Sequence, residues 1–280
     1  MKICVLIPCY MTENSRKINL DNLRKLKETE FKYVDEVVIC DQCFEEGDYI
    51  EGFKYLGPYG KMPHGCLDAR NILFHWFYNS DYDYAILMDA RESLSKSGLN
   101  AFVTLVNNIR NNIIDVDVIQ STLGISISQE RIADKQRSDY KNSLYIRPSR
   151  VQPHLHHCFI SNFKKKYGLE LYIEPETVFA DNFKVTDDLY FITKLERYFD
   201  LYLIGEMVVN TGPQSASLWA TAKGSESTKG IPWKKELNKV LDKYCDTVFG
   251  YKSYPGSPII LERCDSYKED LSEYKPRSKK

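Results

Sequence analysis

The sequence predicts an α/β fold in which a mainly parallel sheet is covered by helices on both faces, and three observations support this. Apolar runs of strand length alternate with segments of helical periodicity through the first 121 residues, which is typical of a parallel sheet. The runs are continuously apolar, as expected of strands that lie between two helical layers. Acidic residues directly follow two of the runs, and such sheets bind ligands beyond the carboxyl ends of their strands.

The elements of the first half rest on apolar stretches and on the helical periodicity between them. The stretches are Ile-Cys-Val-Leu-Ile at 3–7, Val-Val-Ile at 37–39 and Ala-Ile-Leu-Met at 85–88. We therefore expect, in chain order, a strand at 2–8, a helix at 18–28, a strand at 34–40, a helix at 67–78, a strand at 83–89, a helix at 97–112 and a strand at 116–121.

The second half is less regular. We expect a helix at 187–198, a strand at 201–204, a mobile loop at 211–230, a helix at 232–246 and a frayed tail from 267. The resulting organisation is a nucleotide-sugar-binding half at 1–125, an acceptor-binding and catalytic-base half of the same domain at 126–265, and a flexible tail at 266–280.

Charge is unevenly distributed along the chain. Lys and Arg total 38 and Asp and Glu 39, which gives a net charge of −1 and excludes a uniformly basic nucleic-acid binder. Residues 131–166 nevertheless hold nine cations and two acids, a net +7. The cations are Arg131, Lys135, Arg137, Lys141, Arg147, Arg150, Lys164, Lys165 and Lys166. The segment is either a solvated, locally paired surface or a site for a polyanionic acceptor.

Sequence features also bear on location and on metal binding. No apolar run reaches the length of a membrane span, no export signal is readable, and the eight cysteines are interpreted as reduced thiols, so we expect a cytoplasmic protein. The run His154-Leu-His156-His157-Cys158 resembles a metal cluster. Adjacent histidines cannot face one way on a strand, which favours polar or packing roles.

The loop after the first strand excludes two kinds of nucleotide site. A dinucleotide-binding turn needs G-x-G-x-x-G and a P-loop needs G-x-x-x-x-G-K-[ST]. The segment 8–14, Pro-Cys-Tyr-Met-Thr-Glu-Asn, contains no glycine. A Gly-rich sugar-nucleotide pyrophosphorylase loop is excluded on the same ground.

A different set of motifs remains at the strand ends. The first strand ends in Ile-Pro-Cys-Tyr, the second in Asp41, a Gly65-x-x-x-Ala-Arg70-Asn segment opens a helix, and the third strand ends in Asp89-Ala-Arg91. This order resembles the nucleotide-sugar-binding half of Rossmann-like GT-A glycosyltransferases, especially the inverting family 2-like enzymes. The resemblance covers about residues 2–92 and continues weakly to about 205.

The resemblance implies a donor site and a divalent cation. Its donor-binding residues would be Pro8, Tyr10, Asp41, Arg70, Asp89 and Arg91. Asp89 would also contact the metal, Mg²⁺ or Mn²⁺, which neutralises the departing diphosphate. Arg91 stands where the family has its main acidic ligand, so either Arg91 supplies the positive charge itself or Glu92 takes over as ligand. The plainer reading is that Asp41 and Asp89 only cap loops or helices.

The resemblance also assigns a catalytic base. In the segment Thr186-Asp187-Asp188, Asp188 aligns with the base, and Asp187 belongs to the same acidic pair. Asp188 would take the proton of the acceptor hydroxyl in a single inverting displacement. These residues also suit a helix N-terminus, where acids stabilise the first turn, and both roles can hold at once.

The acceptor is expected to be DNA. The chain looks similar to phage enzymes of the T-even type, which use UDP-glucose to add a second glucose to glucosylated hydroxymethylcytosine. Double-stranded modified DNA would contact the basic segment, and Trp219 would stack on a sugar ring unless it only packs in the core. The alternatives are a glycosyltransferase acting on a cell-envelope glycan and a non-catalytic nucleotide- or nucleic-acid-binding protein.

Overall fold

The structure is a computed structural model of the whole chain. It describes residues 1–62, 65–123, 146–148, 155–173, 187–199, 201–211, 249–252 and 260–263. All structural statements below concern these residues. The predicted helix at 232–246 and the tail from 267 lie outside them.

The described strands and helices follow the expected alternation in the first half of the chain. The strands are β1 (Ile3–Tyr10), β2 (Glu36–Gln42), β3 (Lys54–Tyr59), β4 (Tyr84–Leu87), β5 (Glu92–Leu94), β6 (Val118–Leu123), β7 (Ile146–Pro148), β8 (Cys158–Ser161), β9 (Leu201–Thr211), β10 (Phe249–Lys252) and β11 (Ile260–Arg263). The helices are α1 (Arg16–Glu28), α2 (Cys66–Tyr78), α3 (Lys96–Arg110), α5 (Phe163–Tyr167) and α7 (Asp187–Tyr198), with short 3-10 turns η1 (Phe31–Tyr33) and η2 (Glu46–Asp48). None of the described helices is both long and apolar enough to cross a membrane.

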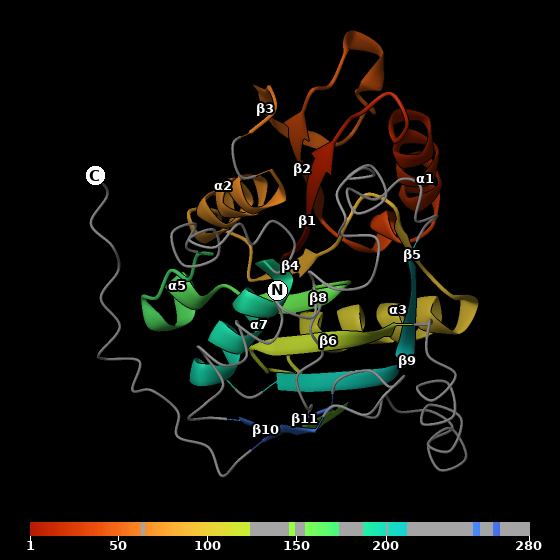
Figure 1. Cartoon of the computed structure of the whole chain (residues 1–280). Helices are drawn as coiled ribbons and strands as arrows, with labels where there is room; N and C mark the ends of the chain where they lie inside the picture. Colours follow the sequence, from red (N-terminus) through yellow and green to blue (C-terminus); the bar gives the residue numbers. More distant parts are fainter. Residues whose placement is uncertain are drawn as a thin grey trace.

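Nine of the described strands form one mixed sheet, which confirms the α/β fold class. The order is β3-β2-β1-β4-β8-β6-β9-β5, with β7 paired to β9 (Figure 1). Pairing is parallel from β3 through β2 and β1 to β4, and again between β6 and β9. β8 runs antiparallel to both β4 and β6, and it therefore joins the two parallel parts.

Helices cover both faces of the sheet, as predicted. Alternate residues of β1 enter two different cores: Cys4 and Leu6 lie with apolar residues of α2 and α7, whereas Ile3, Val5 and Ile7 lie with those of α1 and α3. Figure 1 shows α1 and α2 on opposite sides of β1 and β2. All five β1 residues are at most 1% exposed, which explains why this strand reads as a continuous apolar run.

Four strands of the sheet, β3, β5, β7 and β8, are absent from the sequence-based expectation, and β9 is longer than expected. β3 is an exposed edge strand containing Gly57 and Pro58, so it lacks the apolar run of a central strand. β5 and β7 have only three residues each, and β7 and β8 lie within residues 131–166, which were interpreted from their charge. The strand expected at 201–204 extends to Thr211 because β5 and β6 both pair along it.

Candidate active site

The polar strand ends meet at one edge of the sheet. β1 is parallel to β2, with Cys9 opposite Asp41, and parallel to β4, with Leu6 opposite Leu87. The carboxyl ends of these strands therefore lie side by side, which brings together Tyr10, Asp41 and Asp89. This is the edge at which α/β sheets bind ligands.

Asp41 is buried and its carboxylate is held in place by the segment that follows it. Its Oδ1 accepts a hydrogen bond from the backbone N–H of Tyr59 (3.1 Å), and its Oδ2 accepts one from the hydroxyl of Tyr49 (3.3 Å). Gly57, at φ +144°, comes so close that a Cβ there would lie 2.2 Å from Oδ1. Only glycine fits at this distance, so the close packing of β3 against Asp41 depends on Gly57.

Tyr49, which donates a hydrogen bond to Asp41, packs with two further aromatic rings, and none of the three was predicted from the sequence. The centroid of the Tyr49 ring is 4.8 Å from that of Tyr55 and 5.7 Å from that of Phe44. Tyr49 is 42% exposed, so it presents aromatic surface next to a fixed carboxylate. Such a pairing can stack on a flat heterocycle while accepting a hydrogen bond from it.

Arg70 joins two of the predicted site residues. Its Nη2 lies 3.2 Å from Oδ1 of Asp89, which follows β4, and 2.9 Å from Oδ1 of Asp188, in the first turn of α7. The Arg70 side chain is 5% exposed. One buried guanidinium therefore holds two carboxylates that are 99 residues apart in the sequence.

Burial makes both carboxylates more basic than ordinary aspartates. It raises the pKa of Asp89, and Glu92 raises it further, while Arg70 acts in the opposite direction. Burial likewise raises the pKa of Asp188 against the attraction of Arg70. About a quarter of each side chain is still exposed (25% and 22%). Asp188 can thus both meet a ligand and accept a proton.

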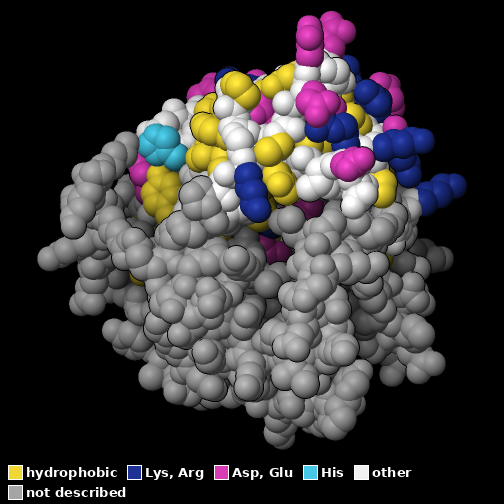
Figure 2. Space-filling model, turned by 45° about the horizontal axis from the view of Figure 1, so that its top comes forward, with side chains coloured by type: hydrophobic (Ala, Val, Ile, Leu, Met, Phe, Trp, Pro, Cys, Tyr) yellow, Lys and Arg dark blue, Asp and Glu magenta, His cyan; other side chains and the backbone are white. Residues whose placement is uncertain are grey.

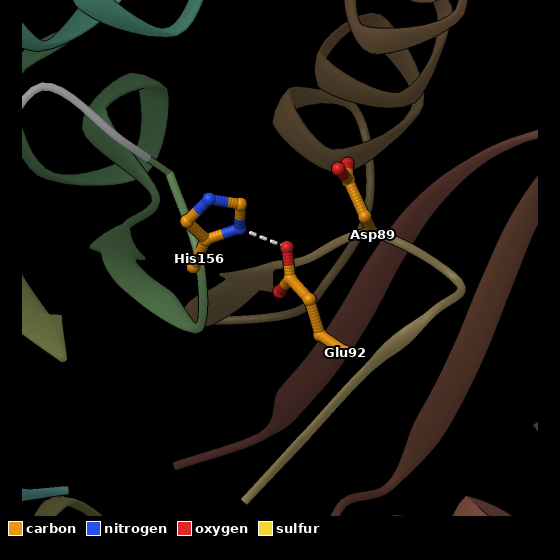
Figure 3. A group of neighbouring side chains, drawn as sticks. All are labelled: Asp89, Glu92 and His156. Carbon is orange, nitrogen blue, oxygen red and sulfur yellow. Dashed lines mark hydrogen bonds and ion pairs between the residues drawn. The ribbon is translucent and has the colours of Figure 1, made fainter. Parts of the chain in front are cut away.

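A potential cation site lies next to this pair. Asp89, Glu92 and His156 offer ligand atoms that all lie within 4.8 Å of one another. Figure 3 shows Glu92 pointing toward His156, with which it forms an ion pair. Burial raises the pKa of Glu92, but His156 and then His157 outweigh this and hold it well below its usual range. Two carboxylates and an imidazole suit a divalent metal such as Mn²⁺, so these residues fit the expected cation.

The histidine pair thus does more than the sequence indicated. His157 makes polar contacts with Glu30 and Glu92, in keeping with the polar role expected for the run. The approach of His156 to Asp89 was missed, because it depends on β8 lying antiparallel to β4. The histidine-rich run and the alternative ligand Glu92 were its only signals.

The remaining predicted donor residues have varied surroundings. Pro8 is buried in β1 opposite Cys40, and Tyr10 is half-buried at the end of the strand. Arg91 is half-buried and forms no ion pair with the residues described. The cation that contacts Asp89 is Arg70, and the hypothesis that Arg91 supplies positive charge to the diphosphate stays a prediction. Asp187 begins α7, and its side chain is not among those described.

Lys164 and Lys165 lie away from the candidate site. β8 runs antiparallel to β4 and ends with Ser161 opposite Tyr84, so α5 begins at the amino edge of β4. There Lys164 Nζ is 2.6 Å from Glu170 Oε1 and Lys165 Nζ is 2.8 Å from Asp83 Oδ1. These two residues therefore form local ion pairs, and their expected role in acceptor binding stays a prediction.

The other predicted acceptor residues are not structurally described. Arg147 lies in β7, of which only the backbone is described. Arg131, Lys135, Arg137, Lys141, Arg150 and Trp219 lie outside the described residues. On the end of the molecule that carries β2 and β3, Figure 2 shows Lys and Arg side chains interspersed with Asp and Glu around apolar ones.

Comparisons with known proteins place the fold. No family model matches the sequence, and no curated protein sequence matches it. Among solved structures the chain is similar to S. aureus TarS 1–349, with a TM-score of 0.51 and 14% identity over 88% of this chain and 71% of that one. The fold is GT-A. Similar structures include TarS 1–349 in complex with UDP-GlcNAc (TM-score 0.51, 14% identity, covering 87% of this chain and 66% of that one) and in complex with UDP (TM-score 0.51, 14% identity, 88% and 71%).

Proposed function

We propose that the protein is an inverting glycosyltransferase that uses a UDP-sugar as donor. The observation that carries this proposal is the ion pairing of Arg70 with both Asp89 and Asp188 at the carboxyl edge of the sheet. The pairing puts a donor-side carboxylate and a basic carboxylate next to each other in a GT-A fold. Support also comes from the similar TarS structures, which hold UDP-GlcNAc and UDP.

In this proposal the nucleotide binds next to Asp41 and its aromatic neighbours. The uracil stacks on Tyr49, and its ring N–H donates to the Asp41 carboxylate, whose orientation is set by Tyr59. Pro8 and Tyr10 line the same edge. This arrangement favours a pyrimidine with a ring N–H, because a carboxylate can only accept hydrogen bonds at neutral pH.

The diphosphate lies toward Asp89. A divalent cation held by Asp89, Glu92 and His156 would neutralise charge on the leaving group when it is bound. Metal binding requires a neutral His156 nitrogen, so it is favoured as pH rises. Arg70 keeps Asp89 oriented, and Arg91 is free to approach the phosphates.

Asp188 acts as the base. Its raised pKa makes it a better proton acceptor than an ordinary aspartate. It takes the proton of the acceptor hydroxyl as that oxygen forms a bond to the anomeric carbon, while the bond from that carbon to the UDP oxygen breaks. The reaction is a single displacement and inverts the configuration. Asp187 supports the start of α7.

We further propose glucose as the transferred sugar and glucosylated hydroxymethylcytosine in double-stranded DNA as the acceptor. The support is the charge of residues 131–150, which hold six cations and two acids and so carry +4. Lys164, Lys165 and Lys166 do not add to this support, because acidic side chains pair with them.

One assay tests the proposal. The purified chain receives radiolabelled UDP-glucose or UDP-GlcNAc, with Mn²⁺ or excess EDTA. The acceptor is glucosylated hydroxymethylcytosine DNA, unmodified DNA or no acceptor. Label should pass to the modified DNA from UDP-glucose only, and EDTA should abolish transfer. Label reaching none of the DNAs while UDP is still released would overturn the DNA acceptor and favour a glycan.

A variant separates catalysis from binding. Asp188→Asn should reduce transfer at least about a thousandfold, while the Kd for UDP stays within about twofold. Asp21→Asn, on the exposed part of α1, is the matched control. A protein that binds UDP but neither transfers nor hydrolyses any UDP-sugar would be the non-catalytic alternative.

A further inference from the structure

Two buried residues that take no part in the proposed chemistry connect the segments on which the cation site is built. Glu30, just before η1, and His157, just before β8, are 3% and 0% exposed. His157 contacts Glu92, which is also 0% exposed, and Glu30 contacts Leu94, two residues after Glu92. Ionisable side chains are rarely buried this fully unless they are paired, so their contacts need an account.

Glu30 uses both of its carboxylate oxygens. Oε1 accepts a hydrogen bond from the backbone N–H of Leu94 (2.6 Å), and Oε2 lies 2.8 Å from Nε2 of His157. Leu94 is two residues after Glu92, and His157 directly follows His156. One side chain of the first α/β unit therefore fixes the distance between the two segments that supply ligands to the candidate cation site.

His157 completes the connection. Its Nδ1 lies 3.3 Å from Oε2 of Glu92, so the imidazole is held between two carboxylates. Its φ of +45° lies in the left-handed region, which non-glycine residues rarely adopt. Such a backbone persists only where its surroundings enforce it, and it is typical of functional sites. The turn also directs adjacent side chains to two different partners: His156 toward Glu92 and Asp89, and His157 toward Glu30.

We propose that Glu30 and His157 are positioning residues that hold Glu92 and His156 in the geometry needed to bind a divalent cation together with Asp89. The inference rests on the cation site of the proposed function. Positioning partners of this kind are commonly worth about 10–100-fold in metal affinity. Because neither residue reaches Asp41 or its aromatic neighbours, metal-free binding of UDP is independent of them.

The test measures Mn²⁺ binding by electron paramagnetic resonance on the full chain, with no acceptor present. Glu30→Gln is nearly isosteric and removes the charge, and His157→Gln removes the imidazole. Each should weaken Mn²⁺ binding about 10–100-fold, while the Kd for UDP in EDTA stays within about twofold. A purely structural role would lower Tm and leave the Mn²⁺ Kd of the folded fraction unchanged.

Glu36→Gln is the matched control. Glu36 is a half-buried carboxylate that accepts a hydrogen bond from Tyr82 (3.1 Å) at the amino end of β2, away from the candidate site. Its Mn²⁺ Kd should equal that of the wild type. If Glu30→Gln does not fold, Glu30→Asp carries the same test, because it keeps the charge but cannot reach both partners.

The outcomes distinguish the inference from the function on which it rests. The positioning role alone would be overturned if the Glu30 variant and His157→Gln both bind Mn²⁺ with wild-type affinity. The Glu30 variant is Glu30→Gln, or Glu30→Asp if Glu30→Gln does not fold. Absence of Mn²⁺ binding by the wild type would overturn both this role and the cation site, whereas metal-independent transfer from UDP-glucose would leave the rest of the proposed function intact.

Discussion

Arg70 and Asp188 form an ion pair of 2.9 Å between Nη2 and Oδ1, which joins helix α2 to the first turn of helix α7. The same guanidinium contacts Asp89 at 3.2 Å. The base of the proposed reaction is thus oriented by a residue that the resemblance assigns to the donor side. The Arg70 guanidinium therefore contacts both the donor-side carboxylate and the base of the proposed reaction.

Replacing Arg70 should affect both activity and stability. In Arg70→Ala two carboxylates lose their common partner, so we expect a loss of about 3–5 kcal/mol in the free energy of unfolding and at least a hundredfold loss of transfer. Arg70→Lys keeps the charge but not the planar guanidinium whose Nη2 contacts both acids, so its transfer should also fall. Arg110→Lys, in the exposed pair with Asp35 (2.8 Å), should change stability by less than about 1 kcal/mol. Equal effects at the two positions in urea unfolding would contradict this account.

The rate of transfer should depend on pH through the Asp188 carboxyl. Burial raises its pKa, and the base must be deprotonated to act. The acid limb of the kcat/KM profile should therefore lie above the pKa of an ordinary aspartate, with activity falling as pH falls through it. Since Asp89 and Asp188 share Arg70, the limb reports the pair. Activity that stays constant down to the pH at which exposed aspartates protonate would argue against Asp188 as the base.

Gly57→Ala tests whether Asp41 binds the nucleotide. The new Cβ would meet Oδ1 of Asp41 at 2.2 Å, at a φ of +144°, so the carboxylate or β3 must shift. We expect about 1–3 kcal/mol of destabilisation and a UDP Kd weakened about tenfold, measured by calorimetry. Gly60→Ala is the control, because nothing lies within 4 Å of a Cβ there. A UDP Kd unchanged in Gly57→Ala would remove Asp41 from the donor site.

The stability of the metal-free protein should fall at high pH because of His157. Burial lowers the pKa of its imidazole, but Glu30 and Glu92 outweigh this and raise it to about 9. A raised pKa means that the folded state holds the proton more tightly. This stabilisation is complete below the unfolded value of about 6.5 and is lost as pH rises through about 9, amounting to about 3 kcal/mol. In EDTA, His157→Gln should lack this loss, whereas His75→Gln should retain it. Parallel pH curves for wild type and His157→Gln would contradict the pairing.

Lys165 and Arg137 should differ in their effect on DNA binding. Lys165 is already paired with Asp83 at the amino edge of β4, so Lys165→Gln should leave the salt dependence of binding unchanged. Arg137 belongs to the segment with a net +4, so Arg137→Gln should reduce the slope of log K against log salt by about 1. Equal slopes for the two variants in fluorescence titrations would count against the proposed role of the segment.

The central part of the fold could be predicted from the sequence because its strands are buried, and buried strands are apolar. β1, β2 and β4 are covered on both faces, so each is an apolar run with polar residues at its end. β3 is exposed at the sheet edge, and its residue 57 must be glycine because the Asp41 carboxylate lies where a Cβ would be. That requirement comes from a tertiary contact, so no local pattern indicates β3.

Some residues of the candidate site could be predicted from the sequence, but none of their contacts could, and the aromatic rings beside Asp41 were missed. Asp89 and Asp188 stand out as acids after a strand and at a helix start. Their shared partner depends on how α7 packs against α2, which periodicity does not encode. The pairing of Glu92 with His156 spans 64 residues and follows from the antiparallel entry of β8. Arg70 and Arg91 are both expected donor residues, and of these two Arg70 contacts Asp89.

The turn from Asp89 to Glu92 is stabilised by hydrogen bonds from Asn22 of α1. The side-chain amide of Asn22 donates hydrogen bonds to the carbonyl oxygens of Ala90 (2.9 Å) and Glu92 (2.8 Å). The turn is therefore ordered by the fold before any ligand arrives, and its conformational entropy is lost during folding rather than during binding. In the proposed function, less of the interaction energy of the nucleotide is then spent on ordering the chain, and more of it remains as affinity.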